Sequence, residues 1–446
     1  MLSRFFVRQP SLFVLLLLLF LLLSGEKLEG SDLLECYHKA KEHDPQYLSV
    51  YHEYKAQQTL PRQSWSQLLP QVYGSYGSTN FDFTEAPETY TNYKGDRLNI
   101  TLRQPIFNLA KFIDVGQNKL RASSGELKFL DTKNNLMIRV SEAYFRHLHA
   151  TEYLEVLLEE EKATTENLKM IRLLFGAGET TLVDLHDAEA RKSEVDFRLI
   201  DARNRTEITR HELERLIGGK IGPIAHLSED IAISSPSPEN IEDWVKEVKD
   251  KNPVVRYYAL SSDIMKAELR KQKAQYLPTF ELVGSYSKSN TTAEYVKTDT
   301  TAYYAGGFQI SMPLFTGGYI YYKVQEVSER HAQAVKDYEK ALSDAIQNVR
   351  NSFLGVHSSI SKVKSAQAYL NASQTVLIST KIGYQSGVRT IVDLLNATTS
   401  FYKAKGELLQ VRIDYVIQKL KLFYWNGRID ENSIAEINKY LVGRQR

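Results

Sequence analysis

Two stretches of the chain alternate apolar and polar residues with a period of two. The alternation runs from Thr279 to Tyr286 and returns from Tyr303 to Met312, and an earlier copy pairs Val72–Phe83 with Arg97–Arg103. Side chains two positions apart share one face of a strand, so each copy predicts a hairpin of roughly ten-residue strands. Such strands suit a membrane wall or a half-buried soluble hairpin equally well. The predicted hairpins cover about 71–107 and about 279–315.

Each hairpin is followed by a long stretch without proline, Asn108–Leu174 and Thr316–Lys381. At 1.5 Å per residue, a helix of this length reaches roughly 100 Å. Such helices need lateral packing, since propensity alone does not specify one. The second stretch carries an apolar seam with spacings of four and three, typical of a coiled coil: Leu342, Ile346, Val349, Phe353, Val356, Ile360 and Val363. In the first stretch, Ser141 and Glu152 interrupt the corresponding seam.

The same landmarks occur twice at a constant offset. The segments 175–185 and 384–394 share the order aromatic, x, x, Gly, x, x, Thr, aliphatic, Val, Asp, Leu, which places Gly178 and Gly387 209 positions apart. Prolines before and after the hairpins repeat at an offset of 208. A constant offset of this kind indicates a tandem duplication.

Each repeat therefore reads helix, hairpin, long helix, tip and return helix. The helix that precedes the first hairpin is expected to run from Gln46 to Gln67. The linker and the tail leave the helices at one level, and we expect them to pack together as a belt around the middle. The predicted organisation is a signal peptide over 1–30, a first repeat over 31–218 with its tip at about 175–184, a linker over 219–252, a second repeat over 253–425 with its tip at about 384–393, and a tail over 426–446.

The first thirty residues look like a secretory signal. Arg4 and Arg8 form a basic start, and Leu12–Leu23 is an apolar core too short to span a bilayer as a helix. Cys36 is the only cysteine, so the chain cannot form an internal disulfide. We expect it to be a small buried residue.

Composition argues against several function classes. The formal net charge is +2, with Lys and Arg scattered, so no nucleic-acid partner is expected. His147 and His149 lack the spacing of a helical zinc site, and Gly176 and Gly178 are not preceded by a strand as in a dinucleotide loop. No Walker loop occurs in the sequence. We expect neither an enzyme nor a cofactor or metal site.

Two hairpins supply four strands, whereas the smallest bacterial barrels need eight. The doubled plan, the Leu-Pro before each hairpin, the Pro-Ile-Phe and Pro-Leu-Phe after them, and the tip sequence Gly387-Val388-Arg389-Thr390-Ile391-Val392-Asp393-Leu394-Leu395 resemble the TolC family of outer-membrane efflux proteins. The likeness covers about Leu33 to Gly427. It implies a mainly α fold with a pair of β-hairpins: a duplicated coiled-coil barrel, with four strands per chain in a trimeric twelve-stranded barrel.

The resemblance also implies function and partners. Such proteins are homotrimers among the lipids of the Gram-negative outer membrane, with a large periplasmic portion. They serve tripartite efflux or type I secretion as passive exit ducts. They dock on a periplasmic adaptor protein and on an inner-membrane pump or ABC exporter.

The resemblance also implies which residues of this chain form the gate, because they match positions in the family's tip motif. Asp393 matches the residue that forms an acidic ring at the periplasmic mouth of the family's channels. The position of the family's second acidic ring is Asn396 in this chain. A trimer would therefore have three carboxylates at the mouth instead of six. Tyr384 and Arg389 match residues that tie the inner coiled coil to the outer one, and Asp184 matches their acidic partner.

Gly178 and Gly387 mark the hairpin tips that would dock on the adaptor. Without the family, Asp184 and Asp393 read as ordinary first-turn or capping acids. The alternative for the whole chain is a periplasmic coiled-coil scaffold or adaptor without a pore. The sequence leaves the cargo open among drugs, metal ions and secreted proteins.

Overall fold

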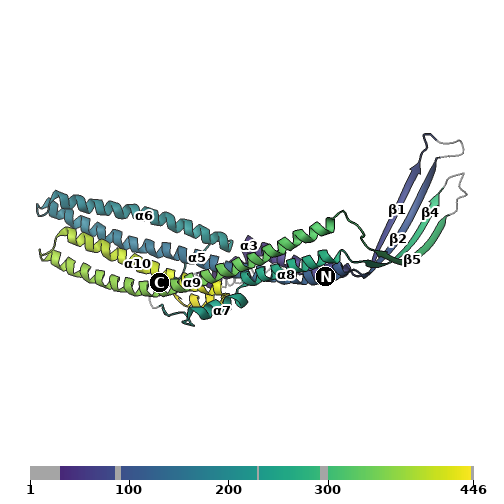
Figure 1. Cartoon of the computed structure of the whole chain (residues 1–446). Helices are drawn as coiled ribbons and strands as arrows, with labels where there is room; N and C mark the ends of the chain where they lie inside the picture. Colours follow the sequence, from purple (N-terminus) through teal and green to yellow (C-terminus); the bar gives the residue numbers. More distant parts are fainter. Residues whose placement is uncertain (1–30, 86–91, 229–230, 292–299, 443–446) are drawn as a thin grey trace, which may run out of the picture.

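The chain forms a long, slender molecule with a β-sheet at one end and helical tips at the other (Figure 1). The computed structural model describes residues 31–85, 92–228, 231–291 and 300–442. The predicted signal peptide, 1–30, lies outside the described residues. Within the described ranges, no helix is both long enough and apolar enough to cross a membrane.

The sheet contains four antiparallel strands in the order β1-β2-β4-β5. Its strands are β1 (Gln71–Phe81), β2 (Tyr93–Phe107), β4 (Thr279–Thr291) and β5 (Thr301–Ser311). The second strand of the first hairpin pairs with the first strand of the second, from Gly95 opposite Thr291 to Phe107 opposite Phe280. This pairing joins the two repeats into one sheet.

Two of the strands are longer than the sequence predicts, since β2 has 15 residues and β4 has 13. The alternation ends earlier because Ser287–Asn290 is polar at every position. A backbone ladder does not need an apolar face, so pairing continues where the pattern stops.

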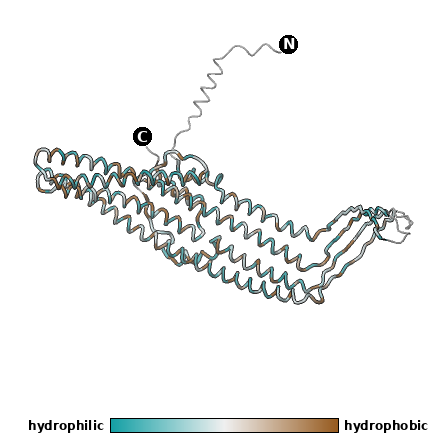
Figure 2. The backbone as a smooth tube through the Cα atoms, turned by 90° about the horizontal axis from the view of Figure 1, so that it is seen from above, coloured by the Kyte–Doolittle hydropathy of each residue, from teal (hydrophilic) through white to brown (hydrophobic). Residues whose placement is uncertain are grey.

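Four long helices form the rest of the length: α5 (Leu109–Gly176), α6 (Leu182–Ile217), α9 (Tyr319–Gln385) and α10 (Ile391–Asn426). They lie side by side in the order α6, α5, α10, α9 toward the tips (Figure 1). The predicted seam of α9 is confirmed, because Val349, Phe353, Val356 and Val363 are buried in the central apolar cluster. Figure 2 shows the apolar residues interspersed along the helices rather than gathered in one segment.

The prediction of one continuous helix over 46–67 is wrong. The structure has two helices there, α3 (Pro45–Gln57) and α4 (Leu60–Ser66). Pro61 lies in the first turn of α4, where its missing N–H costs nothing, but inside a continuous helix its ring would clash with the preceding turn. The second repeat has Leu269 at the matching position, and α8 (Pro253–Ala274) is continuous.

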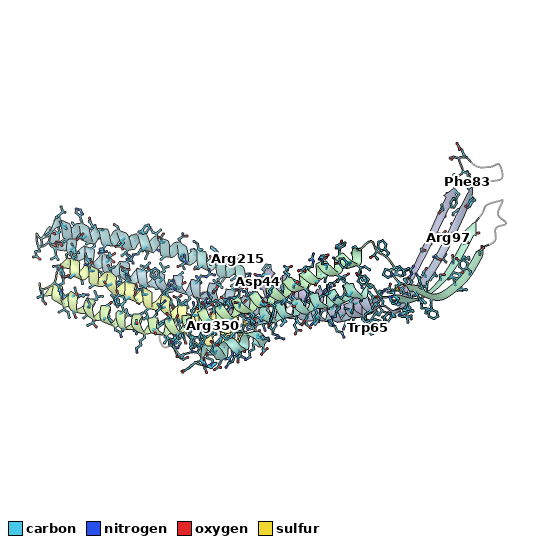
Figure 3. The ribbon with its side chains drawn as sticks, viewed as in Figure 1. Asp44, Trp65, Phe83, Arg97, Arg215 and Arg350 are labelled. Atoms are coloured by element: carbon cyan, nitrogen blue, oxygen red, sulfur yellow. The ribbon has the colours of Figure 1, made fainter. Side chains whose placement is uncertain are left out.

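The linker and the tail meet at the middle of the molecule, as predicted. Here lie α2 (Leu33–His43), α7 (Ile241–Lys251), α11 (Glu431–Asn438) and two short paired strands, β3 (His226–Leu227) and β6 (Leu441–Val442). In Figure 3, Arg350 marks the level of this belt and Phe83 the far end of the sheet.

Glu152 fastens the belt to α5. Its carboxylate accepts a hydrogen bond from the Leu227 backbone N–H at 2.8 Å and lies 3.3 Å from Nδ1 of His226. Burial raises the pKa of this carboxyl above its usual value. The polar residue that interrupts the first seam is therefore the anchor of β3.

Candidate functional site at the helical tips

Both helix-to-helix turns lie at the end of the molecule opposite the sheet (Figure 1). In each, a glycine adopts the left-handed conformation, Gly178 with φ +77° and Gly387 with φ +75°. Residues with a Cβ rarely adopt this conformation, so the glycines allow the chain to reverse within a few residues. The repeated Gly in the sequence thus has a repeated structural cause.

The acids after the two glycines both close capping boxes. The Thr181 hydroxyl accepts a hydrogen bond from the Asp184 N–H, while Asp184 accepts from the Thr181 N–H. Thr390 and Asp393 repeat the arrangement at 3.1 and 3.0 Å. Such a box satisfies N–H groups that the first helical turn leaves without partners.

Hydrogen bonding lowers the pKa of both acids. The Thr181 hydroxyl and N–H lower the pKa of Asp184, and the Thr390 N–H lowers that of Asp393. The capping interpretation therefore holds for both acids in the single chain. It does not conflict with a gate, because Asp393 is partly exposed and still presents its charge.

Tyr384 lies close enough to Asp184 to be affected by its charge. Its ring packs against a small apolar cluster at the tips, and burial, followed by the charge of Asp184, raises the pKa of its phenol. Arg389 packs its side chain over Gly383, where an added Cβ would lie 2.8 Å from the Arg389 Cγ. Among the described residues no ion pair joins Arg389 to Asp184.

The small cluster brings the two helical hairpins together. Leu168, Ile171 and Ala188 come from the first hairpin, and Ile391, Leu394 and Leu395 come from the second. Farther from the tips, Lys405 Nζ lies 2.5 Å from Glu159 Oε2 and joins α10 to α5. Apolar packing and this ion pair thus both join the two hairpins within the chain.

Asn396, expected at the second ring, has a partner that the sequence reading missed. Its amide oxygen accepts a hydrogen bond from Arg191 Nη2 at 3.1 Å. Arg191 lies seven residues after Asp184 in α6, and Asn396 lies three after Asp393 in α10. No signal in the sequence pairs them, because the two residues meet only after α6 and α10 pack together.

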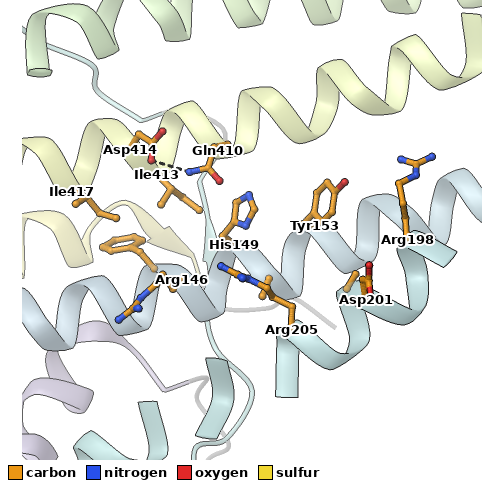
Figure 4. A pocket seen from close by; sticks show the side chains of 13 residues that line it. Arg146, His149, Tyr153, Arg198, Asp201, Arg205, Gln410, Ile413, Asp414 and Ile417 are labelled. Atoms are coloured by element: carbon orange, nitrogen blue, oxygen red, sulfur yellow. Dashed lines mark hydrogen bonds between the residues drawn. The ribbon is translucent and has the colours of Figure 1, made fainter. Parts of the chain in front are cut away.

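A cavity of about 540 Å³ lies farther along the helices, between α5, α6 and α10 (Figure 4). The rings of His149 and Tyr153 stack along its wall with centroids 5.7 Å apart. His147 is not among the residues that line it and hydrogen-bonds the Thr209 hydroxyl at 3.2 Å. Asp414 accepts a hydrogen bond from Gln410 at its rim. The two histidines thus have separate roles in packing.

A solved structure has the same fold as this chain. The outer membrane protein VceC from Vibrio cholerae superposes with a TM-score of 0.77 at 16% identity, covering 89% of this chain and 96% of that one. The two chains therefore share one fold, built in this chain from duplicated helical hairpins with a four-stranded sheet at one end.

The sequence comparisons identify the family. The sequence profile described as outer membrane efflux protein matches residues 36–219 and 244–427, two blocks 208 positions apart. The alkaline protease secretion protein AprF of Pseudomonas aeruginosa is 27% identical over 92% of this chain and 88% of its own. The outer membrane protein TolC of Vibrio cholerae is 26% identical over 92% and 93%.

This chain belongs to the outer membrane efflux protein family. It is a channel of the Gram-negative outer membrane in the tripartite efflux and type I secretion class, and it transports without catalysing a reaction. The alternative of a periplasmic scaffold without a pore is wrong, because the family match covers both repeats.

Proposed function

We propose that three copies of this chain assemble into one duct, with their sheets forming a shared wall and their helices a common tunnel. The open sheet is the observation that carries this proposal. Among the described strands, β1 and β5 each have a partner on one side only. Unpaired backbone groups cost several kcal/mol each inside a membrane, so β1 of one copy pairing with β5 of the next removes that cost.

The assembly test uses the purified mature protein in detergent. Light scattering is expected to give a protein mass of three chains, and planar bilayers are expected to show discrete conductance steps. A water-soluble monomer that needs no detergent and conducts nothing would refute the assembly.

At the mouth, the Asp393 carboxylates of three copies form a negative ring around the axis. A ring of carboxylates attracts cations and is blocked by divalent ones. Since Asn396 carries no charge, the ring holds three carboxylates instead of six, and the block is weaker than six would give. Tyr384, Arg389 and Asp184 hold the inner hairpin against the outer one in the closed state.

Divalent block in planar bilayers tests the ring. Asp393→Asn is expected to weaken the block at least about threefold, because it removes all fixed charge of the ring. Asp187→Asn removes an exposed acid near the other tip and serves as the matched control. Equal block in wild type and Asp393→Asn would eliminate this residue as the ring.

The tips dock on a periplasmic adaptor protein that connects the duct to an inner-membrane pump or ABC exporter. The turns around Gly178 and Gly387 are the part of the helices farthest from the sheet, which supports this placement. The likeness to AprF, a protein named for alkaline protease secretion, favours an exported protein as cargo.

Photocrosslinkers at Glu179 and Val388 test the docking, since both side chains are exposed at the tips. We expect both sites to capture one periplasmic protein with its own helical hairpin. Ser78, exposed on β1, is the control and should not capture it. Capture of the partner from Ser78 alone would place the docking site at the sheet and refute docking at the tips.

A further inference from the structure

The side chain of Arg191 reaches across from one hairpin to the other at the tips. Its Nη2 donates to the Asn396 amide oxygen at 3.1 Å, and its Nη1 donates to Glu194 on its own helix at 3.2 Å. Asn396 and Asp393 are three positions apart in α10 and therefore lie on one face. Arg191 thus contacts α10 on the face that carries Asp393.

Within the described chain, this is the one side-chain hydrogen bond between α6 and α10. Among the described residues, neither tip acid makes a hydrogen bond to the other hairpin, and the bonds of each fall on its Oδ2. Asp184 already accepts from the Thr180 hydroxyl and from the Thr181 hydroxyl and N–H, all on its own side of the turn. Asp393 accepts a hydrogen bond from the Thr390 N–H, also on its own side of the turn.

We propose that Arg191 is the positioning residue that holds α10 against α6 in the closed mouth of this chain. This inference rests on the proposed gate. The tie joins a cation to a neutral amide, since Glu194 supplies the neighbouring negative charge from the same helix. A hydrogen bond with one charged partner is weaker than an ion pair between two, so the mouth of this chain opens more readily than one with a carboxylate at position 396.

Two substitutions are expected to change the open fraction of the channel in opposite directions. Arg191→Gln removes the cation and is expected to raise the open fraction in planar bilayers at least about threefold, because one charge-assisted hydrogen bond is lost per chain. Asn396→Asp converts the tie into an ion pair and is expected to lower the open fraction by a similar factor.

The dependence of the open fraction on ionic strength distinguishes a direct electrostatic contact between Arg191 and residue 396 from a general effect on the structure. Closure by Asn396→Asp should weaken as ionic strength rises, because salt screens an exposed ion pair. Wild type should change less. The double variant Arg191→Gln/Asn396→Asp keeps the new acid without its partner and is expected to lose the closing effect, so closure in the double variant would overturn the proposal.

Arg203→Gln is the matched control, since Arg203 is an exposed arginine of α6 that makes no hydrogen bond or ion pair with α10 among the described residues. Its open fraction should equal that of wild type. All variants must show the wild-type assembly mass and melting temperature. If channels form and Asp393→Asn alters the divalent block while Arg191→Gln leaves the open fraction unchanged, the tie is refuted and the gate stands. Failure of wild type to conduct would refute the gate itself.

Discussion

Arg428 grips Glu247 with two parallel hydrogen bonds. Its Nε donates to Oε2 at 2.7 Å and its Nη2 to Oε1 at 2.8 Å, while the guanidinium lies 4.5 Å from the centre of the Trp244 ring. Trp244 is wholly buried, and its indole N–H donates to the Pro238 carbonyl. Arg428, near the start of the tail, is thereby fixed to α7, the helix of the linker.

Loss of this contact should loosen the middle of the molecule. Arg428→Ala removes a bidentate ion pair and the stacked cation, and is expected to destabilise the fold by about 1–3 kcal/mol. Thermal unfolding in detergent measures this loss of stability as a lower midpoint temperature of unfolding. Arg350→Ala is the control, because its pair with Glu242 also involves α7 but is about half exposed. That variant should shift the midpoint little, and equal shifts would contradict the assignment.

The same pair predicts a pH dependence. The Arg428 hydrogen bonds lower the pKa of Glu247 from 4.5 to about 2. A carboxyl with a lower pKa in the folded state stabilises the fold above its unfolded pKa and loses that contribution as pH falls. Stability should therefore drop between about pH 4.5 and pH 2, by about 1–2 kcal/mol after allowing for partial exposure. Glu247→Gln should flatten the curve of melting temperature in this window, and an unchanged curve would count against the pair.

Gly427 ends α10 in a place that admits no side chain. Its φ is +83°, and an added Cβ would lie 2.4 Å from the Lys251 carbonyl oxygen. Gly427→Ala therefore combines backbone strain with a clash against the backbone, and we expect a loss of about 2 kcal/mol or more in unfolding free energy. Gly219→Ala is the control, since its Cβ would meet nothing within 4 Å. Similar midpoints for both variants would contradict the steric account.

The duplication was open to sequence reasoning because residues with one structural role recur at one offset. Gly178 and Gly387 have nearly the same φ, and Thr181 and Thr390 cap their helices in the same way. The break at Pro61 could have been predicted as well, since a proline ends or kinks a helix wherever it occurs.

The contacts of single side chains could not be predicted. Nothing in the sequence places Glu152 against Leu227, or Arg191 against Asn396, because these residues meet only after separate helices and the linker pack together. The periodicity of a sequence predicts which face of a helix or strand a residue lies on. Which side chain it meets on the neighbouring helix depends on how far the two helices are shifted along their axes. The tip acids were found by motif, and their capping role follows from local spacing alone.

Glu160 and Arg198 offer the sharpest test of the packing between α5 and α6. The Glu160 side chain is 2% exposed, and Arg198 Nη2 donates to its Oε1 at 2.7 Å. Arg198→Met leaves a buried carboxylate without a cation, which typically costs about 3–5 kcal/mol. Adding Glu160→Gln removes the buried charge, so the double variant should recover most of that loss. Unfolding midpoints of wild type, both single variants and the double variant give the coupling between the two residues. If the two losses simply add, the pair does not act as a unit and the helices are held by their apolar contacts alone.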